Sequence, residues 1–242
     1  MHVPTLTKNA MKPLFSLCVA VLVVLCCSAP AAASKVGGFE LGGFGEFSWS
    51  SVSNGLLVVS DERAYEGLRA AKASNSGIGN QYQRVWHDVS WGEGSEVWYG
   101  MALFVPQLAD WCWWQPVRWD NYKSFGSGGD VGGVRIDHGE LFVDRGTYAS
   151  QGPLIGPVAV PEGRWFWLEV HQRFSATAGD ALSEVYLDGV KVGASSEANS
   201  AGRVINTIRY GNVAMEAGCS APSSIFFDRV SLTDRQLGPL QP

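Results

Sequence analysis

The segment EVYLDGVKVG, residues 184–193, decides the fold class. Asp188 and Gly189 separate two short runs, EVYL and VKV, that are rich in strand-forming residues. Both turn residues tolerate the positive φ of a two-residue type I′ turn, so the segment predicts an antiparallel β-hairpin. Its acidic residues are expected on a solvent-exposed hairpin rather than in a catalytic centre.

The segment GRWFWLEVHQRF, residues 163–174, lies just upstream and alternates two faces. One face is apolar and is expected in a core; it consists of Phe166, Leu168, Val170 and Phe174. The other face could be a second sheet face, a ligand floor or plain surface; it consists of Trp165, Trp167, Glu169, His171 and Arg173.

Similar short apolar runs recur along the chain, separated by turn-forming residues such as Asn54-Gly55 and Gly179-Asp180. Apolar periodicity of the helical kind is scarce, and the chain has 29 glycines. We therefore predict an all-β fold, an antiparallel β-sandwich of the jelly-roll kind. The expected strands are 56–59, 68–73, 82–89, 97–105, 131–136, 141–143, 165–174, 182–192, 204–210 and 225–232.

The N-terminal 33 residues are typical of a secretory signal peptide. Lys8 and Lys12 precede an apolar run from Leu14 to Cys27, and small residues follow at 31–33. Residues 34–235 are then one sandwich domain, and residues 236–242 are expected to be a loose tail. The expected location is secreted, periplasmic or on the cell surface.

The charge balance restricts the partners. The whole chain has a formal net charge of −5, and losing the two signal lysines makes it −7. Nucleic acids and anionic membranes require a basic surface, so neither is an expected partner. No segment after the signal is long and apolar enough to insert into a bilayer. An uncharged or cationic ligand is easier to reconcile with this charge.

Two cysteines, Cys112 and Cys219, remain after the signal. In an exported protein an isolated pair predicts a disulfide more than a metal site, because two thiolates do not complete a tetrahedral shell. A reactive thiol is the alternative.

The segment DWCWWQPVRWDNY, residues 110–122, concentrates four tryptophans among polar residues. Pro116 would interrupt a core strand, and the polar side chains would need buried partners, so a partly exposed edge or loop is expected. Indole rings that stack on sugars, beside polar groups that bind hydroxyls, predict a carbohydrate site. Its expected ligand-binding residues are Trp111, Trp113, Trp114, Gln115, Arg118, Trp119, Asp120 and Tyr122. Some of these tryptophans could instead fill the core.

The two ends of the chain resemble jelly-roll modules of the concanavalin A-like and laminin-G-like kind. The resemblance is carried by GGFELGGFGEFSWS (37–50), LLVVSDERAYEGLRAAKA (56–73) and SIFFDRVSL (224–232), together with GRWFWLEV and EVYLDGVKVG. Carbohydrate-binding modules, lectins, glucanases and polysaccharide lyases share this architecture, so the resemblance implies a fold more than a function.

The resemblance also implies a structural calcium ion. In similar carbohydrate-binding jelly rolls, the positions of Glu40 and Asp228 help to hold calcium where the first and last strands meet. Calcium needs about six or more oxygen ligands. The alternative is that both carboxylates only accept hydrogen bonds from backbone groups or from an arginine such as Arg229.

Two enzyme classes of this fold provide templates. The Glu-x-Asp-x-x-Glu strand of similar glucanases is absent. Jelly-roll lyases need a group that neutralises the sugar carboxylate, together with a base and an acid. A lyase reading would use Gln115, Arg118, His171 and Tyr210, with His87 and His138 as further possible bases. The sequence departs from both lyase motifs. Gln115 is followed by Pro116-Val117-Arg118 instead of a histidine two residues on, and the order TIRYGN around Tyr210 does not follow the Lys-x-Gly-x-Tyr pattern.

The leading hypothesis is therefore an exported, non-catalytic protein that binds a polysaccharide or other glycan. The alternatives are a lyase or glycoside hydrolase with a divergent site, and an envelope adhesin or structural module. Apart from calcium, no cofactor is expected, and the sequence leaves the oligomeric state open.

Overall fold

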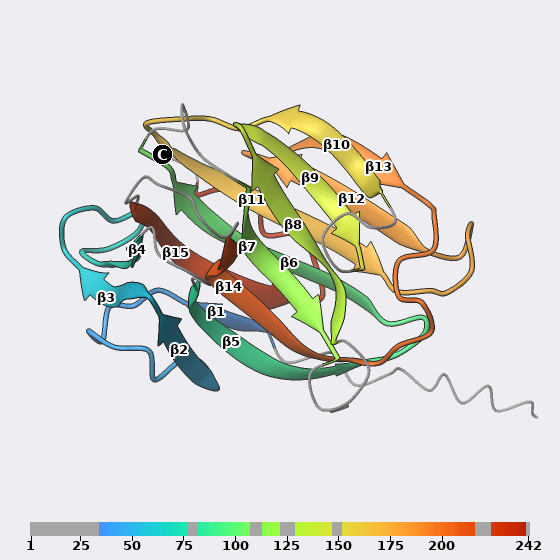
Figure 1. The fold of residues 1–242 in the computed structure, drawn as a ribbon, viewed down its shortest axis with the longest axis horizontal. Coiled ribbons are helices and arrows are strands. Elements are labelled where there is room, and N and C mark those ends of the chain that lie inside the picture. Colours follow the sequence, from blue (N-terminus) through green and yellow to red (C-terminus); the bar gives the residue numbers. More distant parts are fainter. Residues whose placement is uncertain are drawn as a thin grey trace, which may run out of the picture. The chain divides into compact units, whose positions relative to one another are not determined.

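The chain is described by a computed structural model that covers residues 34–76, 82–106, 113–121, 129–146, 152–215 and 224–240. These residues belong to one compact unit, Ala32–Pro242. They form two antiparallel sheets packed as a sandwich (Figure 1), so the predicted all-β fold is confirmed. In the described part of the chain no helix is long and apolar enough to cross a membrane.

The first sheet has eight strands. Its spatial order is β13 (Val190–Ser195), β12 (Leu182–Leu187), β11 (Trp165–Arg173), β6 (Glu96–Phe104), β15 (Ser224–Thr233), β4 (Ala70–Asn75) and β3 (Gly55–Ser60), and β1 (Lys35–Gly37) also pairs with β15. The second sheet has seven strands. Its spatial order is β10 (Pro153–Ala159), β9 (Glu140–Arg145), β8 (Asp130–Asp137), β7 (Trp114–Asp120), β14 (Ile205–Met215), β5 (Tyr82–Trp91) and β2 (Trp49–Ser53).

Alternating apolar residues of both sheets build the core between them. On β11, Phe166, Leu168 and Val170 are fully buried, as the alternation predicted. Tyr99 of β6 and Trp119 of β7 meet across the sandwich with ring centroids 5.6 Å apart. Every second residue of the central strands therefore faces the core, and the residues between them face outward.

The predicted hairpin is confirmed in β12 and β13, which pair through the turn at Asp188 and Gly189. Both turn residues have positive φ, 51° and 81°. The Asp188 carboxylate accepts a hydrogen bond from the backbone N–H of Trp167 at 2.8 Å. It also binds the guanidinium of Arg164 at 2.9 Å. The acid at this turn therefore ties the hairpin to the start of β11.

The tryptophan segment differs from the prediction of an edge or loop. Its residues Trp114–Asp120 form β7, a central strand between β8 and β14. Pro116 is accommodated because the pairing with β8 shifts register between Trp114 and Val117. A β-bulge leaves a residue without ladder hydrogen bonds, and it is one of the few places where a sheet admits proline.

The predicted loose tail is also wrong for the described residues. The N–H groups of Leu237 and Gly238 donate to the Glu169 carboxylate at 2.8 and 3.2 Å. The N–H of Leu240 donates to the hydroxyl of Tyr65 at 3.1 Å. The C-terminal segment is therefore held against β11 and the loop before β4.

Some predictions fall on residues outside the described ranges. They concern the signal peptide at 1–33, the disulfide between Cys112 and Cys219, and the ligand contacts of Trp111 and Tyr122. These stay predictions.

Candidate functional site

A row of large side chains crosses the outer face of the seven-stranded sheet. Trp49 of β2 lies opposite Trp86 of β5, Trp86 lies opposite Arg209 of β14, and Arg209 lies opposite Arg118 of β7. Directly opposed residues of an antiparallel sheet point to the same face. The sequence neighbours of Arg209 and Arg118 lie in the core, so the row faces outward.

The two arginines of the row share one carboxylate. Arg118 Nε donates to Asp120 Oδ1 at 2.6 Å, and Arg209 Nε lies 3.0 Å from Asp120 Oδ2. Asp120 is completely buried, whereas the Arg118 side chain is 13% exposed. Arg209 also lies over the ring of Trp86, with its guanidinium carbon 5.8 Å from the ring centroid. One negative charge therefore fixes two guanidinium groups beside the indole.

A third arginine, Arg84, lies on the same face of β5, two residues before Trp86. It donates to the Ser51 hydroxyl at 3.2 Å and to the Val213 carbonyl at 3.1 Å, and it lies over the ring of Tyr82. Burial, followed by the positive charges of Arg209 and Arg118, lowers the pKa of Arg84 to about 10. Three guanidinium groups therefore lie near one carboxylate, that of Asp120. An anionic ligand bound beside them would reduce the repulsion between their positive charges.

The aromatic end of the row is the more accessible end. Trp49 is 63% exposed on the edge strand β2, and Trp86 is half-buried. Neither tryptophan was predicted from the sequence as a site residue. The alternation of residues in β5 could have identified Trp86 as an outward-facing side chain. Gln83, Val85 and His87 fall on the buried face, so Tyr82, Arg84 and Trp86 fall on the outer face.

The predicted aromatic platform of β7 is wrong for two of its members. Trp114 and Trp119 are fully buried in the core between the sheets. Their burial follows from the central position of β7, whose alternate residues must fill the sandwich. Trp113 is half-buried. Of the polar residues, Arg118 and Asp120 lie in the row described above, and Gln115 is 3% exposed beside Gly133.

The four residues of the lyase reading do not form one site. Arg118 and Gln115 lie on the outer side of the seven-stranded sheet. Tyr210 is in the core, where its hydroxyl donates to the Ser231 carbonyl at 3.4 Å and burial raises its pKa above the usual range. His171 lies on the outer face of the other sheet.

The other described histidines are also engaged elsewhere. His171 stacks on Trp98 with ring centroids 4.0 Å apart, between the carboxylates of Glu96 and Glu184 at 2.8 and 2.9 Å. His87 is buried and stacks on Phe47. His138 lies in the turn between β8 and β9 with its Nδ1 on Asp137. Among the described residues, no histidine therefore projects from the row of arginines.

The residues predicted to hold calcium face backbone donors. Asp228 accepts hydrogen bonds from the N–H groups of Tyr65 and Glu66 at 3.0 and 3.1 Å and from that of Arg229. Glu40 accepts from the N–H groups of Leu68 and Arg69. A calcium site presents oxygens, so N–H groups around both carboxylates fit the hydrogen-bonding alternative better. Calcium binding itself stays a prediction.

Burial shifts the pKa of Asp228. Asp228 is fully buried, and burial raises its pKa to about 6 against the opposing effect of its three N–H donors. The nearby charge of Glu40 acts in the same direction as burial. Asp228 joins the 61–69 loop to the last strand, and Glu40 joins the same loop to the segment that follows β1.

Comparison with solved structures finds the same architecture in carbohydrate-related proteins. An endo-β-1,4-glucuronan lyase from the fungus Trichoderma reesei matches with a TM-score of 0.68 at 16% identity, over 88% of this chain and all of that one. The cellulose-induced protein Cip1 matches with a TM-score of 0.59 at 17% identity, over 84% and 98% of the two chains. The alginate lyase Aly36B matches with a TM-score of 0.54 at 13% identity, over 87% and 100%.

The fold is a jelly-roll β-sandwich. No family model and no curated protein sequence matches the chain. At these low identities the jelly-roll likeness establishes the fold alone, and the site must be interpreted from its own residues.

Proposed function

We propose that this jelly-roll protein binds an acidic polysaccharide across the outer face of its seven-stranded sheet and does not cleave it. The observation that carries the proposal is the row Trp49–Trp86–Arg209–Arg118, which runs in register over four adjacent strands. A row across strands places a new side chain about every 4.8 Å. An extended glycan could contact several of them in succession.

The chemistry of the row suits a chain of uronic acids. An indole ring offers a flat apolar surface to the C–H face of a sugar ring, and Trp49 and Trp86 supply two such surfaces. A guanidinium group binds a carboxylate through two parallel hydrogen bonds. Arg118 and Arg84 are partly exposed and are the proposed carboxylate ligands. Buried Asp120 holds Arg118 in position, and the Ser51 hydroxyl and the Val213 carbonyl hold Arg84.

The similar structures support the same class of ligand. Two of the three are named as lyases of glucuronan and alginate, which are uronic-acid polymers. A protein that meets such polymers is expected outside the cell, in agreement with the signal peptide predicted at 1–33. The extracellular location is part of the proposal.

A polysaccharide lyase is the second candidate, and the names of these neighbours favour it. Lyase chemistry needs a base near the sugar as well as a carboxylate ligand. The described histidines lie in the core, in the β8–β9 turn and on the opposite sheet face. Because no described histidine lies on the row, we propose binding without cleavage; a lyase at this site would have to use Tyr82, on the same face of β5, as its base.

Binding by variants tests the proposal. A glucuronan oligosaccharide should bind to the wild-type protein in a calorimetric titration. The Trp49→Ala and Arg118→Gln variants should each bind about tenfold or more weakly, because each loses one kind of contact. Incubation with polymeric glucuronan should release no unsaturated ends, which ultraviolet absorbance detects.

Two matched variants serve as controls. Leu68→Ala removes an exposed apolar side chain outside the row, and Arg164→Gln removes an exposed arginine that pairs with Asp188. Both should bind like the wild type. Equal affinity in the row variants would overturn the site, and release of unsaturated ends would establish the lyase instead.

A further inference from the structure

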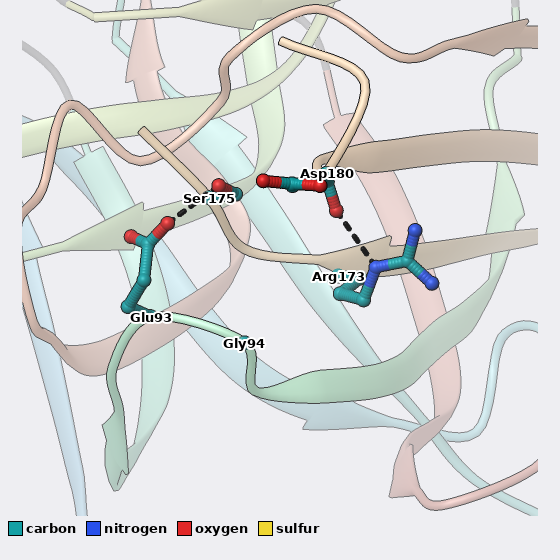
Figure 2. A pocket seen from close by; sticks show the side chains of 5 residues that line it. All are labelled: Glu93, Gly94, Arg173, Ser175 and Asp180. Atoms are coloured by element: carbon teal, nitrogen blue, oxygen red, sulfur yellow. Dashed lines mark hydrogen bonds between the residues drawn. The ribbon is translucent and has the colours of Figure 1, made fainter. Parts of the chain in front are cut away.

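A separate pocket lies at the loop end of the sandwich. It has a volume of about 290 Å³ and is lined by Glu93, Gly94, Arg173, Ser175 and Asp180 (Figure 2). The turn between β5 and β6 supplies the first two residues. The end of β11 and the loop before β12 supply the other three. Small-molecule sites usually measure about 300–1,000 Å³, so this pocket has room for a single sugar ring.

The floor of the pocket is fixed by hydrogen bonds. Glu93 accepts from the Ser175 hydroxyl and from the Ala176 N–H, and these bonds lower its pKa below the usual range. Asn199, which is 2% exposed, accepts from the Ser175 N–H at 2.9 Å and donates to the Arg173 carbonyl at 3.1 Å. Three loops are therefore joined under the pocket, and a ligand would not have to order them.

Two side chains at the pocket keep free hydrogen-bonding groups. Arg173 Nε donates to the backbone carbonyl of Asp180 at 2.7 Å, and Figure 2 shows Asp180 between Arg173 and Ser175. Within the described part of the chain, the two terminal nitrogens of Arg173 and the Asp180 carboxylate have no hydrogen-bond partner. A donor group and an acceptor group therefore remain in the lining of the same pocket.

The charge of the lining selects among ligands. Arg173 and Asp180 balance one another, and Glu93 leaves the lining with a net negative charge. A uronate would be repelled, and the positive charge of Arg173 in the same lining makes a cationic ligand less favourable. Neighbouring hydroxyl groups both donate and accept hydrogen bonds, so they suit this pair of groups.

We infer that this pocket is a second carbohydrate site, which binds a neutral sugar unit through its hydroxyl groups on Asp180 and Arg173. The inference does not depend on the acidic-glycan site, which lies on the outer face of the other sheet. A protein with both sites would bind two glycan segments of different charge.

Two variants test the pocket without disturbing its floor. Asp180 is exposed, so Asp180→Ala removes the free acceptor at little structural cost. Gly94 has a φ of 77°, and a Cβ there meets no atom within 4 Å. Asparagine tolerates this conformation, so Gly94→Asn puts a side chain into the open space and leaves the bond from its N–H to the Phe174 carbonyl intact.

The probe is cellotetraose, a neutral oligosaccharide, titrated into the protein while amide NMR signals are recorded. The signals of Gly94 and Asp180 should shift, and both variants should weaken binding about tenfold or more. Asp61→Asn, an exposed acid elsewhere, should bind like the wild type. Binding that both variants leave unchanged, no shift in the wild type, or a preference for glucosamine oligomers over cellotetraose would overturn the inference.

The same titration separates the two sites. Arg118→Gln should lose affinity for the glucuronan oligosaccharide and keep its affinity for cellotetraose. Asp180→Ala should do the reverse. If Arg118→Gln does not show its expected effect, the acidic-glycan site is refuted and the pocket is not. If Asp180→Ala does not show its expected effect, the pocket is refuted and the acidic-glycan site is not.

Discussion

Burial controls the charge of single residues in this sandwich, and His87 is the clearest case. It is 3% exposed on β5, with its ring 4.9 Å from that of Phe47. Burial, followed by the charge of Lys35, lowers the pKa of His87 to about 4. The folded protein therefore keeps this histidine neutral well below the pH at which an unfolded chain protonates it.

Acid should accordingly destabilise the protein through His87. Between pH 6.5 and about 4 the unfolded chain binds a proton that the folded chain does not, so the stability from neutral His87 is lost as the pH falls. The loss is on the order of 3 kcal/mol. His87→Phe keeps an aromatic ring and should remove this slope from urea unfolding measured across the pH range.

The comparison with His87→Phe is needed because Asp228 acts in the opposite direction. Its pKa rises to about 6 on folding, so between about pH 4 and 6 the folded chain binds the extra proton and gains stability as the pH falls. At each pH, subtracting the free energy of unfolding of the variant from that of the wild type cancels the contribution of Asp228, which both proteins share. An identical pH dependence in the two proteins would show that His87 titrates normally.

Buried and exposed tryptophans should behave in opposite ways. Trp119→Ala leaves a cavity beside Tyr99 in the core and should lower the free energy of unfolding by about 3–5 kcal/mol. Trp49→Ala removes an exposed ring and should change it by less than about 0.5 kcal/mol while weakening glycan binding. Chemical denaturation of the two variants makes the comparison. A severe loss of stability in Trp49→Ala would mean that its ring is structural.

At the scale of elements, the C-terminal segment is part of the fold. Glu169, on β11, is 1% exposed and accepts the N–H groups of Leu237 and Gly238. A buried carboxylate that loses its hydrogen-bond donors destabilises the folded state, because its lost hydration is no longer compensated. The sequence GPLQP at 238–242 suggested a loose end, because the partner that holds it lies almost 70 residues away in the chain.

Deleting Leu237–Pro242 should therefore lower the stability by about 1–3 kcal/mol. Glu169→Gln in the full chain should have an effect of similar size. Because both changes break the same contact, the combined variant should lose less than the sum of the two. Thermal melts of the four proteins test this, and strict additivity would mean that Glu169 and the tail act independently.

Elements differ in how well local sequence predicts them. The β12–β13 hairpin and the alternation of β11 follow from neighbouring residues and were predicted. The role of β7 was not, because Asp120 is paired both with Arg118 on the same strand and with an arginine of another strand. Arg209, about 90 residues further along the chain, supplies the second partner of Asp120. Pro116 is tolerated only because the register shifts around it.

At the scale of the whole molecule, the net charge and the local charge of the outer sheet face favour different ligands. The chain is acidic overall, at −5, which favoured an uncharged or cationic partner. Three arginines from three strands meet around one aspartate on the seven-stranded sheet, and only the strand order brings them together. Sequence therefore predicted the sandwich, but the location of the arginine row required the topology.

The proposed acidic site should be sensitive to salt. Raising NaCl from about 0.1 M to about 1 M shortens the Debye length from about 10 Å to about 3 Å and weakens attraction between exposed charges. Binding of the glucuronan oligosaccharide should fall about tenfold or more, while binding of cellotetraose should change little. Salt-independent binding of the acidic ligand would argue against contact with Arg84 and Arg118.

The indole N–H signals of the tryptophans test the location of the acidic glycan most directly. During a titration with a glucuronan oligosaccharide, the signals of Trp49 and Trp86 should move together, because both lie on the outer face of the seven-stranded sheet. Those of Trp98 and Trp167, on the opposite outer face, should stay in place. Movement of Trp98 and Trp167 with no change at Trp49 and Trp86 would contradict the proposed function.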